Sequence, residues 1–162
     1  MGHRYSVALV LASLLAVLSG GRALAQAPSA APVEAIPSQG LAFGSLLPGV
    51  PERVQVGDGA RRAEIVLRGQ GWIELSFMLP QAMLSPSGAR IPLRFQANDG
   101  AMLRNSSSGM VTLNPLETNR IHLNPGQGMV RILLGGTAFP AQDQAAGRYT
   151  ATIVVVATTP GT

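Results

Sequence analysis

The sequence contains no cysteine and no lysine. Without cysteine the chain can form no disulfide, thiolate zinc site or iron–sulfur cluster, and it has no thiol nucleophile. Aromatic residues are scarce, with one Trp, four Phe and two Tyr among 162 residues. Only 12% of the residues are charged and 46% are hydrophobic, so the composition indicates a folded chain rather than a disordered one. The length fits a single domain.

Residues 1–25 have the pattern of a signal peptide. Arg4 supplies a positive charge, residues 7–18 form an apolar run, and Ala23 and Ala25 form the small-x-small pattern that a signal peptidase cleaves. The apolar run is shorter than the ~20 residues that a membrane-spanning helix needs. We therefore expect cleavage after Ala25 and export of a 137-residue protein to the periplasm or the outer cell surface of a Gram-negative bacterium, with no membrane attachment.

The charge of the mature chain argues against nucleic acid as a partner. Cleavage removes two of the 12 arginines and leaves a formal charge of +2. The remaining arginines are scattered along the sequence, and no aromatic residues alternate with them to stack on bases. We expect no nucleic-acid binding.

Residues 26–39 differ in composition from the rest of the mature chain. They include Pro28, Pro32 and Pro37 among many alanines and other small residues. Such a segment is typical of an extended chain without a packed core, so we expect a disordered Pro/Ala-rich leader. The folded domain is then expected at residues 40–159.

Apolar and polar residues alternate through most of residues 40–159. The clearest example is residues 72–79, where Ile73, Leu75, Phe77 and Leu79 fall on one face. Turn residues recur about every 8–12 positions, which is typical of sandwiches and barrels. The pattern predicts an all-β, immunoglobulin-like antiparallel β-sandwich of about seven to nine short strands, with little helix. Pro92 predicts that the strand containing it lies at a sheet edge.

The last alternating segment, residues 149–158, has apolar side chains on both faces. Tyr149 and Ile153 lie on one face, while Val154 and Val156 lie on the other. A strand that is apolar on both faces requires cover on both sides. We therefore expect Val154 and Val156 to form a strand-face contact with a partner, and Ile153 to be buried.

The residues that carry chemistry do not form a recognisable site. His122 is the only histidine left after cleavage, and no carboxylate neighbours it in the sequence. Asp58 and Asp99 each precede a glycine, where they favour turns rather than metal binding. Trp72 begins a strand and is expected at the edge of the core. We expect no catalytic residue, no cofactor and no metal ion, and hence a protein that is not an enzyme.

Several short motifs resemble those of an exported bacterial family. Residues 41–44 (LAFG) followed by residues 47–49 (LPG) are similar to the opening of the domain-of-unknown-function 4402 proteins, and residues 147–155 resemble their close. The close is also similar to the last strand of pilus subunits and spore-coat-U-like proteins, which are immunoglobulin-like sandwiches. The resemblance implies a structural or adhesive role at the cell surface. The cysteine pair common in pilus subunits is absent, and each leader proline would remove one backbone N–H from a donated strand.

Two functions follow from these observations. The first is an exported, non-enzymatic β-sandwich that serves as a structural or adhesive, fimbria-like surface component, with protein partners that include other copies of itself. The alternative is a periplasmic module that holds a small ligand between its loops or in its interior. The sequence leaves both open.

Overall fold

The chain folds entirely into β-strands joined by turns and loops, as a computed structural model of residues 33–104, 109–124 and 129–160 shows. These residues form 12 strands and no helix, and all neighbouring strands are antiparallel. The strands are β1 (Glu34–Gln39), β2 (Glu52–Val54), β3 (Ala63–Arg68), β4 (Gly71–Met78), β5 (Ala82–Leu84), β6 (Arg90–Arg94), β7 (Gly100–Leu103), β8 (Val111–Leu113), β9 (Asn119–Leu123), β10 (Val130–Leu134), β11 (Gly136–Ala138) and β12 (Val154–Thr158).

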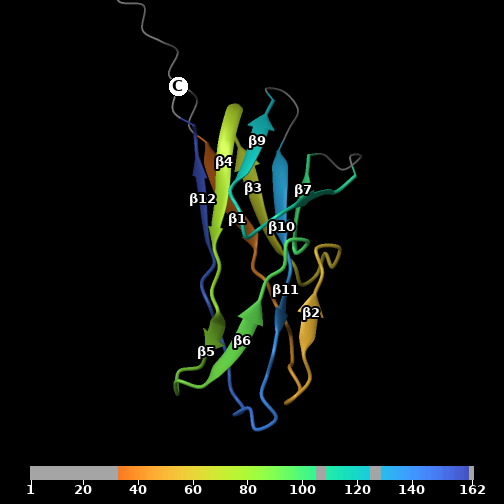
Figure 1. Ribbon diagram of the computed structural model, residues 1–162, viewed down its shortest axis with the longest axis vertical. Coiled ribbons are helices and arrows are strands. Elements are labelled where there is room, and N and C mark those ends of the chain that lie inside the picture. The colour runs from red at the N-terminus through yellow and green to blue at the C-terminus, as the bar shows by residue number, and fades with distance from the viewer. Residues whose placement is uncertain (1–32, 105–108, 125–128, 161–162) are drawn as a thin grey trace, which may run out of the picture.

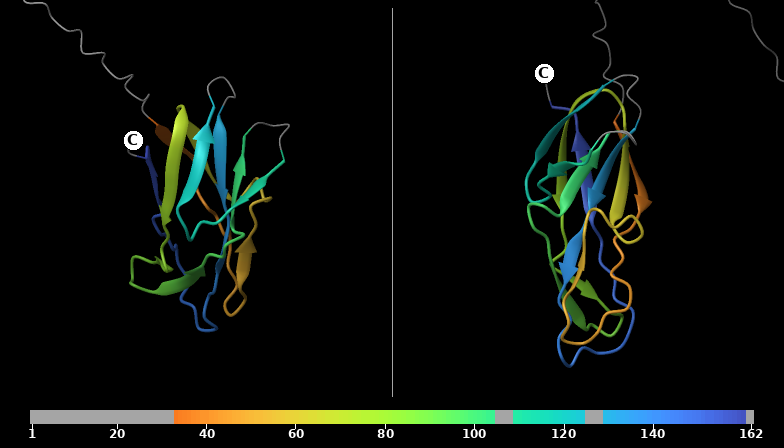
Figure 2. Two further views of the ribbon diagram at one scale, coloured as in Figure 1. Left: turned by 45° about the horizontal axis from the view of Figure 1, so that its top comes forward. Right: turned by 90° about the vertical axis from the view of Figure 1, so that its right-hand side faces the viewer.

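Two sheets pack face to face in one half of the molecule. A five-stranded sheet has the order β1-β3-β10-β7-β8, and a three-stranded sheet has the order β12-β4-β9. The right-hand view of Figure 2 shows the two layers from the side. Inward side chains from both sheets form the first hydrophobic cluster, which includes Ile65, Ile73, Leu75 and Ile132. Burial of this cluster from both sides supplies the main driving force for the sandwich.

The other half of the molecule contains a four-stranded sheet of order β2-β11-β6-β5 (Figure 1). A second hydrophobic cluster packs on it, with Phe43, Val54, Ile91 and Leu93 among its buried members. Only Gly135 separates β10 from β11, so one continuous stretch of chain passes from the five-stranded sheet into the four-stranded sheet.

The predicted all-β sandwich is confirmed, and the alternation of side chains agrees with it. In β3, Ala63, Ile65 and Leu67 are buried, and in β4 Ile73 and Leu75 are completely buried. The structure has 12 strands rather than seven to nine, because long stretches such as residues 130–138 break into two short strands where the chain changes sheets.

The prediction of a disordered leader is wrong for its second half. Glu34–Gln39 form β1, which pairs with β3 from Glu34 opposite Arg68 to Gln39 opposite Glu64. Pro37 is tolerated because β1 is the edge strand of its sheet and pairs on one side only. Residues 26–32, and the predicted cleavage site at Ala23 and Ala25, lie outside the described residues.

The edge position predicted from Pro92 is also wrong, because β6 lies between β11 and β5. The backbone N–H of Phe139, just past the end of β11, donates to the Pro92 carbonyl oxygen at 2.9 Å. The proline nitrogen therefore faces the end of β11, where the missing N–H removes no hydrogen bond from the paired part of that strand.

The last strand is shorter than residues 149–158. Thr150 pairs with Leu84 of β5 in an isolated bridge, and β12 begins only at Val154, where the chain reaches β4. Ile153 precedes β12 and is half-buried rather than buried. In the three stretches of chain that the structure describes, no helix could cross a bilayer.

Candidate functional site

The sandwich is open along one side, where an edge strand of each sheet borders a groove. β1 is the end strand of the five-stranded sheet, β12 is the end strand of the three-stranded sheet, and both line the same groove of about 330 Å³. Among the described residues, no strand pairs with the outer edge of either one. Each strand therefore presents a row of backbone N–H and C=O groups to the same side of the molecule.

The groove exists because β1 presents small or short side chains toward the opposite sheet. Ala35 and Pro37 lie opposite Leu67 and Ile65 of β3, so they share the inward face, yet both remain exposed. Ile153 and Val155 line the facing wall. The lining is largely apolar and contains no charged residue.

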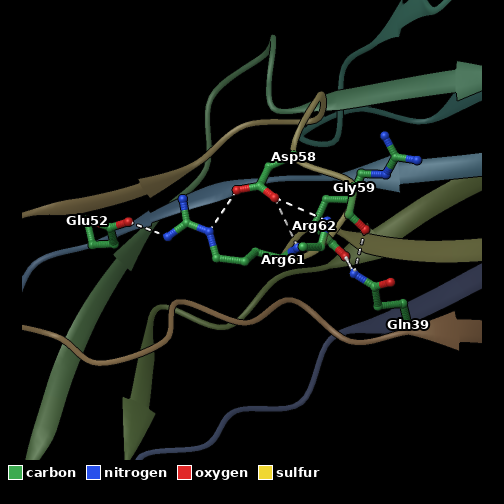
Figure 3. Close-up of polar contacts among 7 residues, drawn as sticks. Gln39, Glu52, Asp58, Gly59, Arg61 and Arg62 are labelled. Carbon is green, nitrogen blue, oxygen red and sulfur yellow. Dashed lines mark hydrogen bonds and ion pairs between the residues drawn. The ribbon is translucent and has the colours of Figure 1, made fainter.

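Gln39 lines the groove and anchors the end of β1 through the contacts drawn in Figure 3. Its side-chain amide donates to the carbonyl oxygen of Arg62 at 2.8 Å and to that of Gly59 at 3.3 Å. A nearby backbone hydrogen bond joins Ala42 N–H to the Arg61 carbonyl at 2.8 Å. These contacts hold the end of β1 against the turn that precedes β3.

That turn is stabilised by Asp58, as expected for an aspartate that precedes glycine. The Asp58 carboxylate accepts backbone N–H groups from Ala60 and Arg61, both at 3.2 Å, and the Arg61 side chain at 2.7 Å. Arg61 also donates to Glu52 of β2 (Figure 3). The hydrogen bond from Arg61 holds the pKa of the Asp58 carboxyl below its usual value, and the bonds to Glu52 and then Asp58 raise the pKa of Arg61. The network thus joins the turn to β2 and holds it in place.

Val154 and Val156, the two residues predicted to form a strand-face contact, lie on the outer face of β12. They are 43% and 39% exposed and point away from the groove. Val154 lies directly opposite Met78 of β4, which is 65% exposed. The three side chains form a small exposed apolar patch on the three-stranded sheet.

A second cluster on the same sheet was not predicted. Trp72 is 50% exposed and lies opposite His122 of β9, with their ring centroids 4.8 Å apart. The Arg120 guanidinium lies 5.0 Å from the centre of the Trp72 ring. The core-edge position expected for Trp72 is therefore wrong. The exposed position of Trp72 could have been predicted from the sequence, because Trp72 is one residue from buried Ile73 and adjacent residues of a strand point to opposite faces.

The described residues contain no group of three or more His, Cys, Asp or Glu side chains that could hold a metal ion. The His122 ring contacts that of Trp72 at a tilt of 46°, and His122 has no carboxylate partner in the described part of the chain. Among the end strands of the three sheets, β1 and β12 both line one groove, and we take this groove as the candidate site.

The chain matches no protein-family model, and no curated protein is significantly similar to it in sequence. The resemblance to the domain-of-unknown-function 4402 proteins stays a prediction.

Proposed function

We propose that this chain is an exported, non-enzymatic structural or adhesive component of the cell surface, and that copies of it associate through their open sides. One observation carries the proposal: the groove between β1 and β12 brings to one side of the sandwich two strand edges with which no described strand pairs. An edge of this kind pairs with another strand, whose backbone supplies the hydrogen bonds and whose side chains enter the groove.

The chemistry of the groove favours a second copy as the partner. Its lining carries no charge, so two copies meet there without repulsion between like charges. In a two-fold arrangement, β1 of one copy lies beside β12 of the other on both sides of the axis. Both exposed apolar grooves are then removed from water together.

The leader of another copy is a poorer partner than an edge strand. Its C-terminal half already pairs with β3 as β1. The remainder contains Pro28 and Pro32, and each proline would remove a hydrogen-bond donor from an added strand. Association by edge strands avoids the first difficulty, and it involves one proline, Pro37 of β1, in place of two.

The test measures the mass of the mature chain by light scattering over a range of concentrations. The wild-type protein is expected to form dimers or larger assemblies. Ala35→Glu places a carboxylate in the groove at an exposed position and is expected to keep the protein monomeric.

The matched control is Ala141→Glu, which adds the same charge to an exposed alanine outside the groove and is expected to associate like the wild type. A wild-type chain that stays monomeric at every concentration contradicts the proposal. So does an Ala35→Glu variant that associates as well as the control.

A further inference from the structure

A second, larger cavity lies beside β5 and β6 of the four-stranded sheet, which contribute Met83 and Ile91 to its lining. It has a volume of about 760 Å³ and lies between the loop at residues 41–48 and the loop at residues 144–149. The latter loop belongs to the blue segment at the bottom of Figure 1. Among the lining residues, only Leu41 also lines the groove between β1 and β12. The volume is within the range of pockets that bind small molecules.

The floor of this pocket is part of the second hydrophobic cluster. Phe43, Met83 and Ile91 are nearly inaccessible to solvent, and Leu46 and Tyr149 pack against them. All five line the pocket. A ligand that enters it therefore meets the partly exposed side chains of Leu46 and Tyr149, which lie on this buried apolar base, and burial of an apolar body against them is favourable.

Hydrogen bonds hold the two walls in place. The N–H of Gly49 donates to the carbonyl of Ala141 at 2.9 Å, which joins the two loops. Within the second wall, the Gln144 amide donates to the Tyr149 hydroxyl at 2.7 Å, and that hydroxyl donates to the carbonyl of Ala145 at 2.6 Å. The pocket is thus largely pre-formed, which lowers the cost of binding.

The rim of the pocket carries a single charge. Arg148 is the only charged residue in the lining, is exposed, and makes no ion pair with any described residue. Ser45 adds a hydroxyl group to the lining. An apolar floor beside one unpaired guanidinium is complementary to a molecule with an apolar body and one negative end.

We propose that this pocket binds amphipathic carboxylates. The apolar chain packs against Leu46 and Tyr149, and the carboxylate pairs with Arg148. This binding is a second function, separate from association through the groove. The proposal names a class of ligand for the small-ligand module that the sequence analysis gave as the alternative function.

The test is calorimetric titration of the mature protein with sodium decanoate, below its micelle concentration. Decanoate is expected to bind, and decyltrimethylammonium, which has the same chain and a positive end, is expected not to bind. Arg148→Gln is expected to weaken decanoate binding about tenfold or more, because it removes a charge-assisted contact. Ala146→Trp, which places a large side chain in the lining, is expected to abolish binding.

Arg68→Gln is the matched control, since it removes the same charge from an exposed arginine outside the pocket. Its decanoate affinity is expected to equal that of the wild type. The proposal is overturned if wild-type protein binds no decanoate, if Arg148→Gln binds it as tightly as Arg68→Gln does, or if decyltrimethylammonium binds equally well. Ala35→Glu is expected to bind decanoate normally, so the failure of one proposal is distinguishable from the failure of the other.

Discussion

The carboxylate of Asp99 accepts a hydrogen bond from the Arg53 guanidinium at 2.8 Å, and this pair ties β2 to the turn before β7. The two partners differ sharply in burial, because the side chain of Asp99 is 1% exposed and that of Arg53 is 41% exposed. Asp99 also accepts the backbone N–H of Gln96 at 2.8 Å, and its own carbonyl accepts the N–H of Gly135 at 2.7 Å. A single buried residue therefore links β2, β7 and the junction of β10 with β11.

Because the two partners differ in burial, replacing each of them with alanine is expected to lower the free energy of unfolding by a different amount. Asp99→Ala removes the acceptor of both the Gln96 N–H in the turn and the Arg53 guanidinium, and is expected to lower the free energy of unfolding by about 2–3 kcal/mol. Arg53→Ala exposes a carboxylate that water can reach through the vacated space, and is expected to cost about 1 kcal/mol or less. Urea unfolding of both variants measures the difference. Equal losses would show that the ion pair itself, rather than the turn, dominates.

Gly135 is expected to tolerate no side chain. A Cβ atom at this position would overlap the carbonyl oxygen of Val54, which belongs to the backbone of β2 and cannot rotate away. Gly135→Ala is therefore expected to lower the free energy of unfolding by about 2–3 kcal/mol. Gly57→Ala is the control, because nothing lies within 4 Å of its Cβ position, and its effect is expected within about 0.5 kcal/mol of zero. Thermal unfolding of the two variants should separate them clearly.

The turn held by Asp58 predicts a dependence of stability on pH. The hydrogen bond from Arg61 lowers the pKa of this carboxyl in the folded state below the ordinary value of 3.8. The contribution of Asp58 is therefore complete above pH 3.8 and is lost as the pH falls below that value, through the folded-state pKa. Asp58→Asn keeps an oxygen acceptor for the turn but lacks the charge. Urea unfolding between pH 6 and pH 2 should show the wild-type advantage over this variant shrinking as acid is added, and a constant difference would contradict the prediction.

Substitution of Ile153 in the groove and of Ile73 in the core is expected to affect folding differently. Ile73 is fully buried between the sheets, and Ile73→Asp is expected to prevent folding because the carboxylate would have no partner there. Ile153 lines the open groove and is half-buried, so Ile153→Asp is expected to fold with a lowered melting temperature. Circular dichroism of the two purified variants distinguishes these outcomes. A folded Ile73→Asp variant would contradict the assigned packing of β4.

The sequence predicted the strands whose two faces have different environments. β3 and β4 each have one face on the core and one toward solvent, so their alternation was readable. The burial of β10 could be predicted only in part from the sequence, because Leu133 is buried as well as Ile132 and Leu134. Leu133 lies on the second face, opposite Glu64 of β3 and Ala101 of β7, and a local pattern cannot show that this face is also buried.

The predictions made from two prolines were both wrong, because the effect of a proline depends on whether its nitrogen faces a paired strand. Pro37 lies in an edge strand that was expected to be disordered, and Pro92 lies in a central strand that was expected at an edge. The cavities could not be predicted at all. Each one depends on side chains from segments far apart in the sequence, such as Ala35 with Ile153 in the groove and Phe43 with Arg148 in the pocket.

The central claim, that copies meet through β1 and β12, is tested most directly by hydrogen exchange of backbone amides in dilute and in concentrated wild-type protein. Pairing of the two strand edges predicts slower exchange on concentration in residues 34–39 and 153–158, with little change elsewhere. Slowing confined to the outer face of β4 and β9, around Trp72 and His122, or no slowing in β1 and β12 while the mass increases, would contradict the account.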